Sequence, residues 1–123
     1  MEPDRFDKSF GRGLRLTANP EFQRVFRNGR RSVDRCFTVL FCHNAQARPR
    51  LGLAIAKRRV RKATARNRLK RLVRESFRGA AADLPAVDIV VLAGPAAATA
   101  DNTTIFASLE QHWRRVAKRG DRQ

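Results

Sequence analysis

Residues 51–78 read LGLAIAKRRVRKATARNRLKRLVRESFR, and this stretch decides the fold more than any other part of the 123-residue chain. Its first six residues are apolar or glycine, which is typical of a buried strand. After Ala65 the apolar residues recur at helical spacing, so that Leu69, Val73 and Phe77 share an arc of about 140° on a helical wheel. The stretch therefore predicts a strand followed by a long helix that packs on one face.

The same stretch carries most of the charge of the chain. Between Lys57 and Arg78, eleven residues are basic and one, Glu75, is acidic. Like-charged neighbours four residues apart, such as Lys70 and Arg74, repel each other on a helix unless a polyanion binds them. The lead-in at residues 57–62 adds cations at the helix N-terminus, which is itself a favourable place for a phosphate. We therefore expect this segment to bind nucleic acid.

The composition of the whole chain agrees with a folded, nucleic-acid-binding domain. Lys and Arg number 27 against 11 Asp and Glu, a formal charge of +16, and 42% of residues are apolar, enough for a core. We expect an N-terminal arm at 1–13, one domain at 14–118 and a tail at 119–123. The longest apolar stretch, 87–93, falls short of the roughly 20 residues of a membrane helix, and no secretory signal is apparent. A cytoplasmic location is expected.

Further elements follow from local patterns. Asn19-Pro20 and Gly29 bracket a predicted helix at 20–28. Residues 36–42 and 86–93 read as strands, and 36–42 is expected to form a hairpin with 51–56, while 102–118 reads as a last helix. In the first strand, Phe37, Val39 and Phe41 share one face. Cys36 and Cys42 lie about 20 Å apart along it, too far for a disulfide, and are expected to be free thiols.

The sequence offers no catalytic centre of its own. No acidic residues form a close pair within a predicted element, and no Cys-x-x-Cys, phosphate-cradling glycine loop or nucleophile elbow occurs. His43 and His112 are expected to be surface residues. We therefore assign no catalytic and no metal-binding residue to the protein.

The segments 51–58 and 65–78, the second containing Arg66-Asn67-Arg68, resemble the bacterial ribonuclease P protein component family. The resemblance extends to Phe22-x-x-Val25-Phe26-x-x-Gly29, to 84–91 and to 109–115, and it covers about residues 14–117. It implies a two-layer α/β (α+β) sandwich, with a small mixed sheet of about four strands and three helices. It also implies that the basic helix makes a left-handed crossover between the strands 51–56 and 86–93, against the usual right-handed rule.

The resemblance further implies a function. Members are the protein subunit of the ribonucleoprotein ribonuclease P, an endoribonuclease that removes the 5′ leader of precursor tRNA in a Mg²⁺-dependent reaction. The catalytic site would belong to the RNA subunit, which would also hold the Mg²⁺. The implied partners are the catalytic RNA and precursor tRNA, with no membrane and no obligate protein partner.

Site residues carry over from the family by position. Those implied to bind the catalytic RNA are Arg61, Lys62, Arg66, Asn67, Arg68, Lys70, Arg71 and Arg74. Those implied to form the cleft for the single-stranded leader are Phe22, Phe26, Phe41, Lys57, Arg58, Arg66 and Asn67. Two departures stand out: Phe41 occupies a place where many members have Tyr, and Gly94-Pro95 replaces a basic pair.

Two alternatives remain open from the sequence. Phe22 and Phe26, four residues apart, could simply pack in the core. The chain could also be a ribosomal protein or an architectural DNA-binding module that uses the same basic helix without any enzymatic role. A leader cleft discriminates between these readings, because a purely structural binder has no need of aromatic side chains beside a basic rim.

Overall fold

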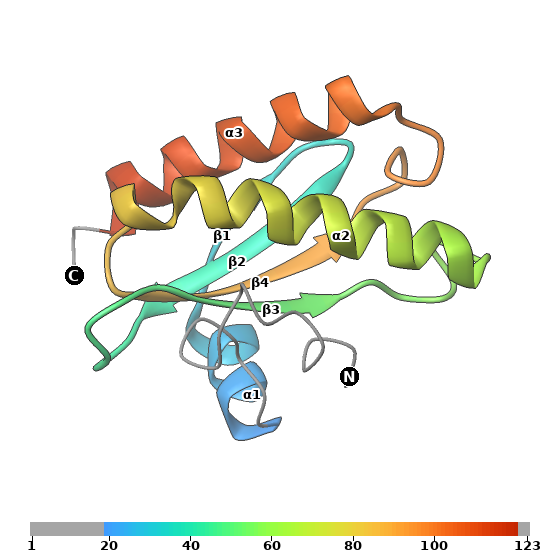
Figure 1. The fold of residues 1–123 in the computed structure, drawn as a ribbon. Helices are drawn as coiled ribbons and strands as arrows, with labels where there is room; N and C mark the ends of the chain where they lie inside the picture. Colours follow the sequence, from blue (N-terminus) through green and yellow to red (C-terminus); the bar gives the residue numbers. More distant parts are fainter. Residues whose placement is uncertain (1–18, 121–123) are drawn as a thin grey trace.

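The computed structural model describes residues 19–120, which form three α-helices and a four-stranded sheet (Figure 1). The predicted arm at 1–13 lies outside the described residues. In chain order the elements are α1 (Asn19–Asn28), β1 (Arg30–Val33), β2 (Phe37–His43), β3 (Arg50–Ala54), α2 (Ala63–Ala80), the 3-10 turn η3 (Ala81–Asp83), β4 (Val87–Ala93) and α3 (Asn102–Gly120). The mixed α+β sandwich implied by the resemblance is thereby confirmed.

The strand order in the sheet is β1-β2-β4-β3. β4 pairs antiparallel with β2 and parallel with β3, so the predicted hairpin between 36–42 and 51–56 is wrong. The reason is burial: six of the seven residues of β4 are buried, and such an apolar strand belongs at the centre of a sheet. β4 therefore separates the two strands that precede it in the chain.

The crossover from β3 through α2 to β4 has the implied left hand. In Figure 1, β3 and β4 run in the same direction, α2 lies above the sheet and β4 lies behind β3. Viewed from the helix-covered face with both strands pointing upward, β4 therefore lies to the left of β3. Nearly all parallel βαβ units have the opposite, right-handed arrangement.

α2 and α3 lie side by side over one face of the sheet and enclose the main core (Figure 1). Phe37, Val39 and Phe41 of β2 point into this core, as their alternation predicts. Leu69, Leu72, Val73 and Phe77 meet them from α2, and Trp113 from α3 stacks edge-on against Phe77 with ring centroids 5.8 Å apart. The predicted apolar arc of the basic helix is thus confirmed.

α1 covers the opposite face of the sheet (Figure 1). Val25 is fully buried there against Leu40 and Val90, in a second, smaller cluster. α1 ends where Gly29 comes close to the backbone, since a Cβ at this position would lie 2.4 Å from the Val25 carbonyl oxygen. Gly94 is similarly confined, because a Cβ would lie 2.6 Å from the Arg35 carbonyl oxygen.

A polar cluster ties α3 to the β1–β2 turn. The Asp34 carboxylate accepts hydrogen bonds from the Ser108 hydroxyl (2.6 Å) and from the backbone N–H groups of Cys36 and Phe37 (2.9 Å each).

His112 is fully buried, with Nδ1 2.7 Å from the Ser32 hydroxyl and Nε2 3.2 Å from Asp34. The expected surface position of His112 is therefore wrong, because its ring fills the space between α3 and β1. His43 is exposed, as expected.

Some element ends differ from those expected. α3 continues to Gly120, and Arg119 donates a hydrogen bond to the Arg31 carbonyl oxygen (3.1 Å), so Arg119 and Gly120 belong to the helix and not to a tail. The cysteines Cys36 and Cys42 are free, as predicted.

Candidate nucleic-acid interface

The turn between β3 and α2 presents a dense group of cations. Lys57, Arg58, Arg59, Arg61 and Lys62 are all exposed, whereas the Val60 side chain between them is buried and fixes the turn to the core. The turn is further closed by backbone hydrogen bonds from Arg59 and Val60 to the Ala56 carbonyl oxygen, both 3.0 Å long. A compact turn of this kind holds its basic side chains outward.

The N-terminus of α2 lies directly beyond this turn. Lys62 has an extended backbone (φ −82°, ψ 133°) and supplies no capping side chain, and the first turn contains no acidic residue. The positive end of the helix dipole is therefore not offset locally, and the adjoining cations add to it. This combination favours binding of a phosphate group.

Arg66 and Asn67 stand at the start of α2. The Arg66 guanidinium donates from Nη1 to the carbonyl oxygens of Val60 and Arg61, both at 2.9 Å, and so joins the turn to the helix. Asn67 is exposed. Arg66 thus has a role in shaping the basic turn as well as in presenting charge.

The Arg68 side chain contacts α3 as well as solvent. Its Nη2 donates to the Ala100 carbonyl oxygen at 2.9 Å and to the Asn102 side-chain oxygen at 2.7 Å, and its Nε also reaches Asn102 at 3.1 Å. Arg68 therefore connects α2 to the start of α3. Among the other predicted helix contacts, Arg71 is exposed, while Lys70 and Arg74 are half-buried.

The two aromatic residues of α1 are on the other face of the sheet. Phe26 is 48% exposed, whereas Phe22 is half-buried against the small cluster that contains Leu40 and Val90. The residues of β3 and β4 beneath α1 include Ala54 and Leu92, so the sheet surface beside the aromatic rings is apolar. Phe26 is thus not a core residue, and the simple packing alternative fails for it.

Phe41 does not belong to this surface. Its side chain is 1% exposed and lies in the main core beneath α2 and α3, so its assignment to the leader cleft is wrong. Successive residues of a strand point to opposite faces, and the neighbours Leu40 and Cys42 are the ones that face α1. The alternation of the strand therefore places Phe41 on the core side of the sheet.

A buried carboxylate fixes α1 to the sheet. Asp88 of β4 is fully buried; Arg50 of β3 donates to it from Nε and Nη2 (2.9 Å each), and Asn44 donates at 2.7 Å. Arg24 of α1 completes the group with an ion pair to the same carboxylate. Arg50 also pairs with Glu21 of α1 at 2.8 Å, and the hydrogen bonds to Asp88 above all raise the pKa of Arg50.

This network was missed from the sequence. Asp88 lies 64 residues from Arg24 and 38 from Arg50, so no local pattern connects them. The one available signal was a single acidic residue inside an apolar strand, which requires a partner when buried.

The structure thus brings the predicted residues together as two groups. The cations of residues 57–62 and α2 form one group, and the aromatic rings of α1 form the other, on the opposite face of the sheet (Figure 1). β3, the strand at this edge of the sheet, leads into the basic turn. A strand of nucleic acid that passes around the β3 edge would meet both groups.

Within residues 19–120, no three His, Cys, Asp or Glu side chains gather closely enough to hold a metal ion. Of the helices described, none has the length and apolar character needed to cross a membrane.

Comparison with known proteins gives a consistent result. A family model described as Ribonuclease P matches residues 10–117. The chain is 43% identical over 113 residues to the ribonuclease P protein component of Pseudoalteromonas atlantica, covering 92% of this chain and 94% of the relative. It is 44% identical over 107 residues to that of Escherichia coli O157:H7, covering 87% and 90%.

Solved structures agree as well. The RNase P protein of Staphylococcus aureus superimposes with a TM-score of 0.78 at 33% identity, covering 87% of this chain and 97% of that one. The RNase P protein of Thermotoga maritima gives a TM-score of 0.75 at 33% identity, with 83% and 96% covered.

Proposed function

The chain belongs to the family of ribonuclease P protein components, and from this membership we propose that its basic segment binds the catalytic RNA while α1 binds the 5′ leader of precursor tRNA. Membership makes it a subunit of ribonuclease P, an endoribonuclease that acts in 5′ maturation of tRNA. Its partner is the RNA of that enzyme.

The exposed cations of residues 57–62 are the observation that carries the proposal. Five basic side chains surround an uncapped helix N-terminus, and this arrangement attracts the phosphates of a folded RNA. Asn67 and Arg71 extend the surface along the exposed side of α2. Arg68 contributes chiefly by holding α2 against α3.

The exposed ring of Phe26 supports the leader-binding role. Single-stranded RNA of varied sequence is commonly held by stacking on aromatic side chains together with cations along the backbone. Phe22 forms the base of this site, and Lys57 and Arg58 would meet the leader where it rounds β3. A protein that only supports RNA structure has no evident use for an exposed Phe26, which favours this role over the ribosomal or architectural alternative.

The protein is proposed to hold and position RNA, while the RNA subunit carries out the cleavage chemistry. The described residues provide no ligand set that fits Mg²⁺. We propose that RNA phosphates bind the Mg²⁺ on which cleavage depends, and that the enzyme acts in the cytoplasm.

The experiment compares binding of leader-bearing precursor with binding of mature tRNA. Phe26→Ala in the RNA–protein complex is expected to weaken precursor binding by about 1–3 kcal/mol and leave mature tRNA unaffected. Val33→Ala is the matched control, since Val33 is another exposed apolar side chain, 55% exposed, on β1. Equal effects of Phe26→Ala on both RNAs, or equal effects of the two variants, would contradict the leader role.

A further inference from the structure

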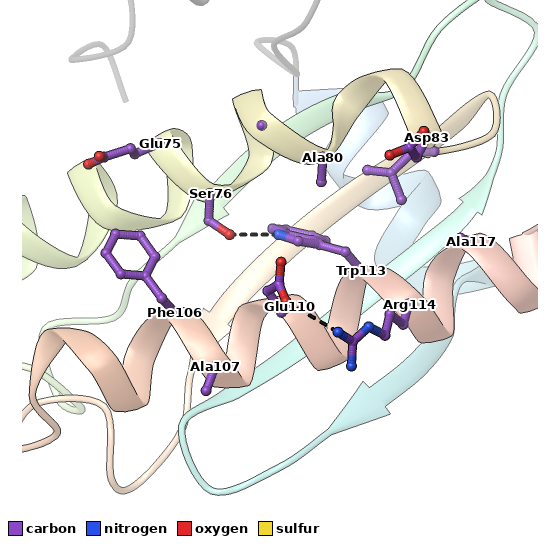
Figure 2. A pocket seen from close by; sticks show the side chains of 12 residues that line it. Glu75, Ser76, Ala80, Asp83, Phe106, Ala107, Glu110, Trp113, Arg114 and Ala117 are labelled. Atoms are coloured by element: carbon purple, nitrogen blue, oxygen red, sulfur yellow. Dashed lines mark hydrogen bonds and ion pairs between the residues drawn. The ribbon is translucent and has the colours of Figure 1, made fainter.

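A pocket of about 620 Å³ lies between α2, η3 and α3, away from α1. Leu84, Phe106 and Trp113 give it an apolar floor, and the indole N–H of Trp113 donates to the Ser76 hydroxyl at 2.8 Å (Figure 2). Its volume falls within the roughly 300–1,000 Å³ of pockets that hold ligands or anchor side chains.

Small residues account for this hollow. Gly79 and Ala80 line it from α2, and Ala107 and Ala117 from α3. A Cβ at Gly79 would have no atom within 4 Å, so there is space above the helix at this point. Beside the pocket, Trp113 of α3 contacts Ser76 and Phe77 of α2, and a groove remains where the side chains of the two helices are short.

The rim of the pocket is acidic in a strongly basic protein. Residues 19–120 contain seven acidic side chains. Four are engaged within the fold, since Glu21 and Asp88 form the ion pairs described above, Asp34 accepts a hydrogen bond from the Ser108 hydroxyl, and Asp101 accepts one from the Thr104 N–H. The remaining three, Glu75, Asp83 and Glu110, all line this pocket, where Glu110 pairs with the exposed Arg114 at 3.4 Å (Figure 2).

We propose that this pocket docks a basic segment of a partner protein, with an apolar side chain over Phe106 and Trp113 and flanking Arg or Lys side chains against the three carboxylates. The carboxylates would repel an RNA phosphate, which excludes the polyanion that the rest of the surface attracts. An apolar floor with an acidic rim instead complements a short segment that carries both an apolar anchor and positive charge.

The docked segment would leave the basic turn at residues 57–62 accessible. The pocket lies at the C-terminal half of α2, around Glu75 and Gly79, whereas the exposed cations of the turn precede the first residue of the helix. Gly79 is about 24 Å along the helix axis from its first residue, Ala63. This inference does not depend on the proposed RNA contacts.

The single tryptophan of the chain, Trp113, allows a direct test. The full chain is titrated with a capped Arg-Arg-Leu-Arg-Arg peptide, while the fluorescence emission of Trp113 is recorded. A saturable change at peptide concentrations below about 1 mM is expected. Because a chain of charge +16 repels a cationic peptide in general, saturation would require a local acidic site.

Four comparisons decide the outcome. The triple variant Glu75→Gln, Asp83→Asn, Glu110→Gln is expected to bind roughly tenfold more weakly, and Asp101→Asn, which removes a charge outside the pocket, to bind as the parent does. Gly79→Leu, which fills the groove, is expected to abolish the change. Removal of the anchor, as Arg-Arg-Gly-Arg-Arg, is expected to weaken binding.

Several results would overturn the proposal. They are the absence of a saturable change, equal binding by the triple variant, and equal binding of a Glu-Glu-Leu-Glu-Glu peptide. An equal response to spermidine at the same concentrations would also overturn it, because the site would then recognise a small cation and not a protein segment. Circular dichroism of each variant confirms that it is folded.

Discussion

Arg50 holds the buried carboxylate of Asp88 through two hydrogen bonds of 2.9 Å, one to each oxygen. This bidentate pair joins the parallel strands β3 and β4, and Arg24 and Glu21 extend it to α1. The helix that carries Phe26 is therefore positioned by an ion-pair network and by the burial of Val25. Removal of one charge from the network tests this relationship.

Asp88→Asn is expected to lower the free energy of unfolding by about 3 kcal/mol, because it leaves the Arg50 guanidinium without its buried counter-charge. Urea denaturation measures the loss. Glu21→Gln removes a half-exposed partner of the same arginine and is expected to cost less than about 1 kcal/mol. Equal losses in the two variants would show that the buried ion pair of Arg50 with Asp88 contributes no more to stability than its half-exposed pair with Glu21.

Arg68 and Arg71 are expected to differ although they are neighbours on one basic helix. Arg68→Ala removes hydrogen bonds to Ala100 and Asn102 and is expected to lower stability by about 1 kcal/mol. Arg71→Ala is expected to leave stability within about 0.5 kcal/mol of the parent. It should reduce the salt dependence of RNA affinity by about one ion. An unchanged salt slope for Arg71→Ala would remove this residue from the RNA interface.

The buried His112 makes stability depend on pH. Burial lowers its pKa below the ordinary value of 6.5, although Asp34 acts in the opposite direction, and Arg115 adds to the lowering. Because the folded state then binds a proton less readily than the unfolded state, the contribution of His112 to stability is constant well above pH 6.5 and decreases as the pH falls from about 6.5 toward the folded pKa.

The expected slope in this range is at most about 1.4 kcal/mol per pH unit. Urea denaturation at several pH values measures it, and His112→Gln provides the comparison. The slope between pH 5 and 6.5 should decrease in the variant, whatever its absolute stability. A variant with the parental slope would show that another group is responsible.

Gly79→Ala is expected to raise the free energy of unfolding by about 0.5–1 kcal/mol. The residue lies inside α2, and alanine there leaves the unfolded chain fewer conformations to lose on folding than glycine does. A Cβ at this position has no atom within 4 Å, so the substitution causes no clash. Thermal unfolding followed by circular dichroism measures this effect. A lower melting temperature would reveal a close contact at this position.

Local sequence patterns were sufficient to predict the elements whose apolar residues recur with a clear period. The apolar arc of α2, the alternation of β2 and the Gly29 end of α1 all follow from residues within a few positions of one another. β1 escaped notice because only Ser32 of its four residues is buried, which gives no apolar alternation.

Partners distant in the sequence could not be found in this way. The insertion of β4 between β2 and β3 depends on the crossover helix, and the ion pair of Asp88 with Arg24 spans 64 residues. His112 likewise meets Ser32 from 80 residues away. Such contacts are set by the packing of whole elements, so the face on which Phe41 lies is decided by the sheet and not by the motif around it.

The most direct test of the account is cleavage of a precursor tRNA at its 5′ end by a bacterial ribonuclease P RNA at low Mg²⁺. The reaction is run with the RNA alone, with this protein alone, and with both. Efficient cleavage is expected only when both are present. Cleavage by the protein alone would contradict the placement of the chemistry in the RNA, and no stimulation of a compatible RNA by folded protein would contradict the RNA- and leader-binding role.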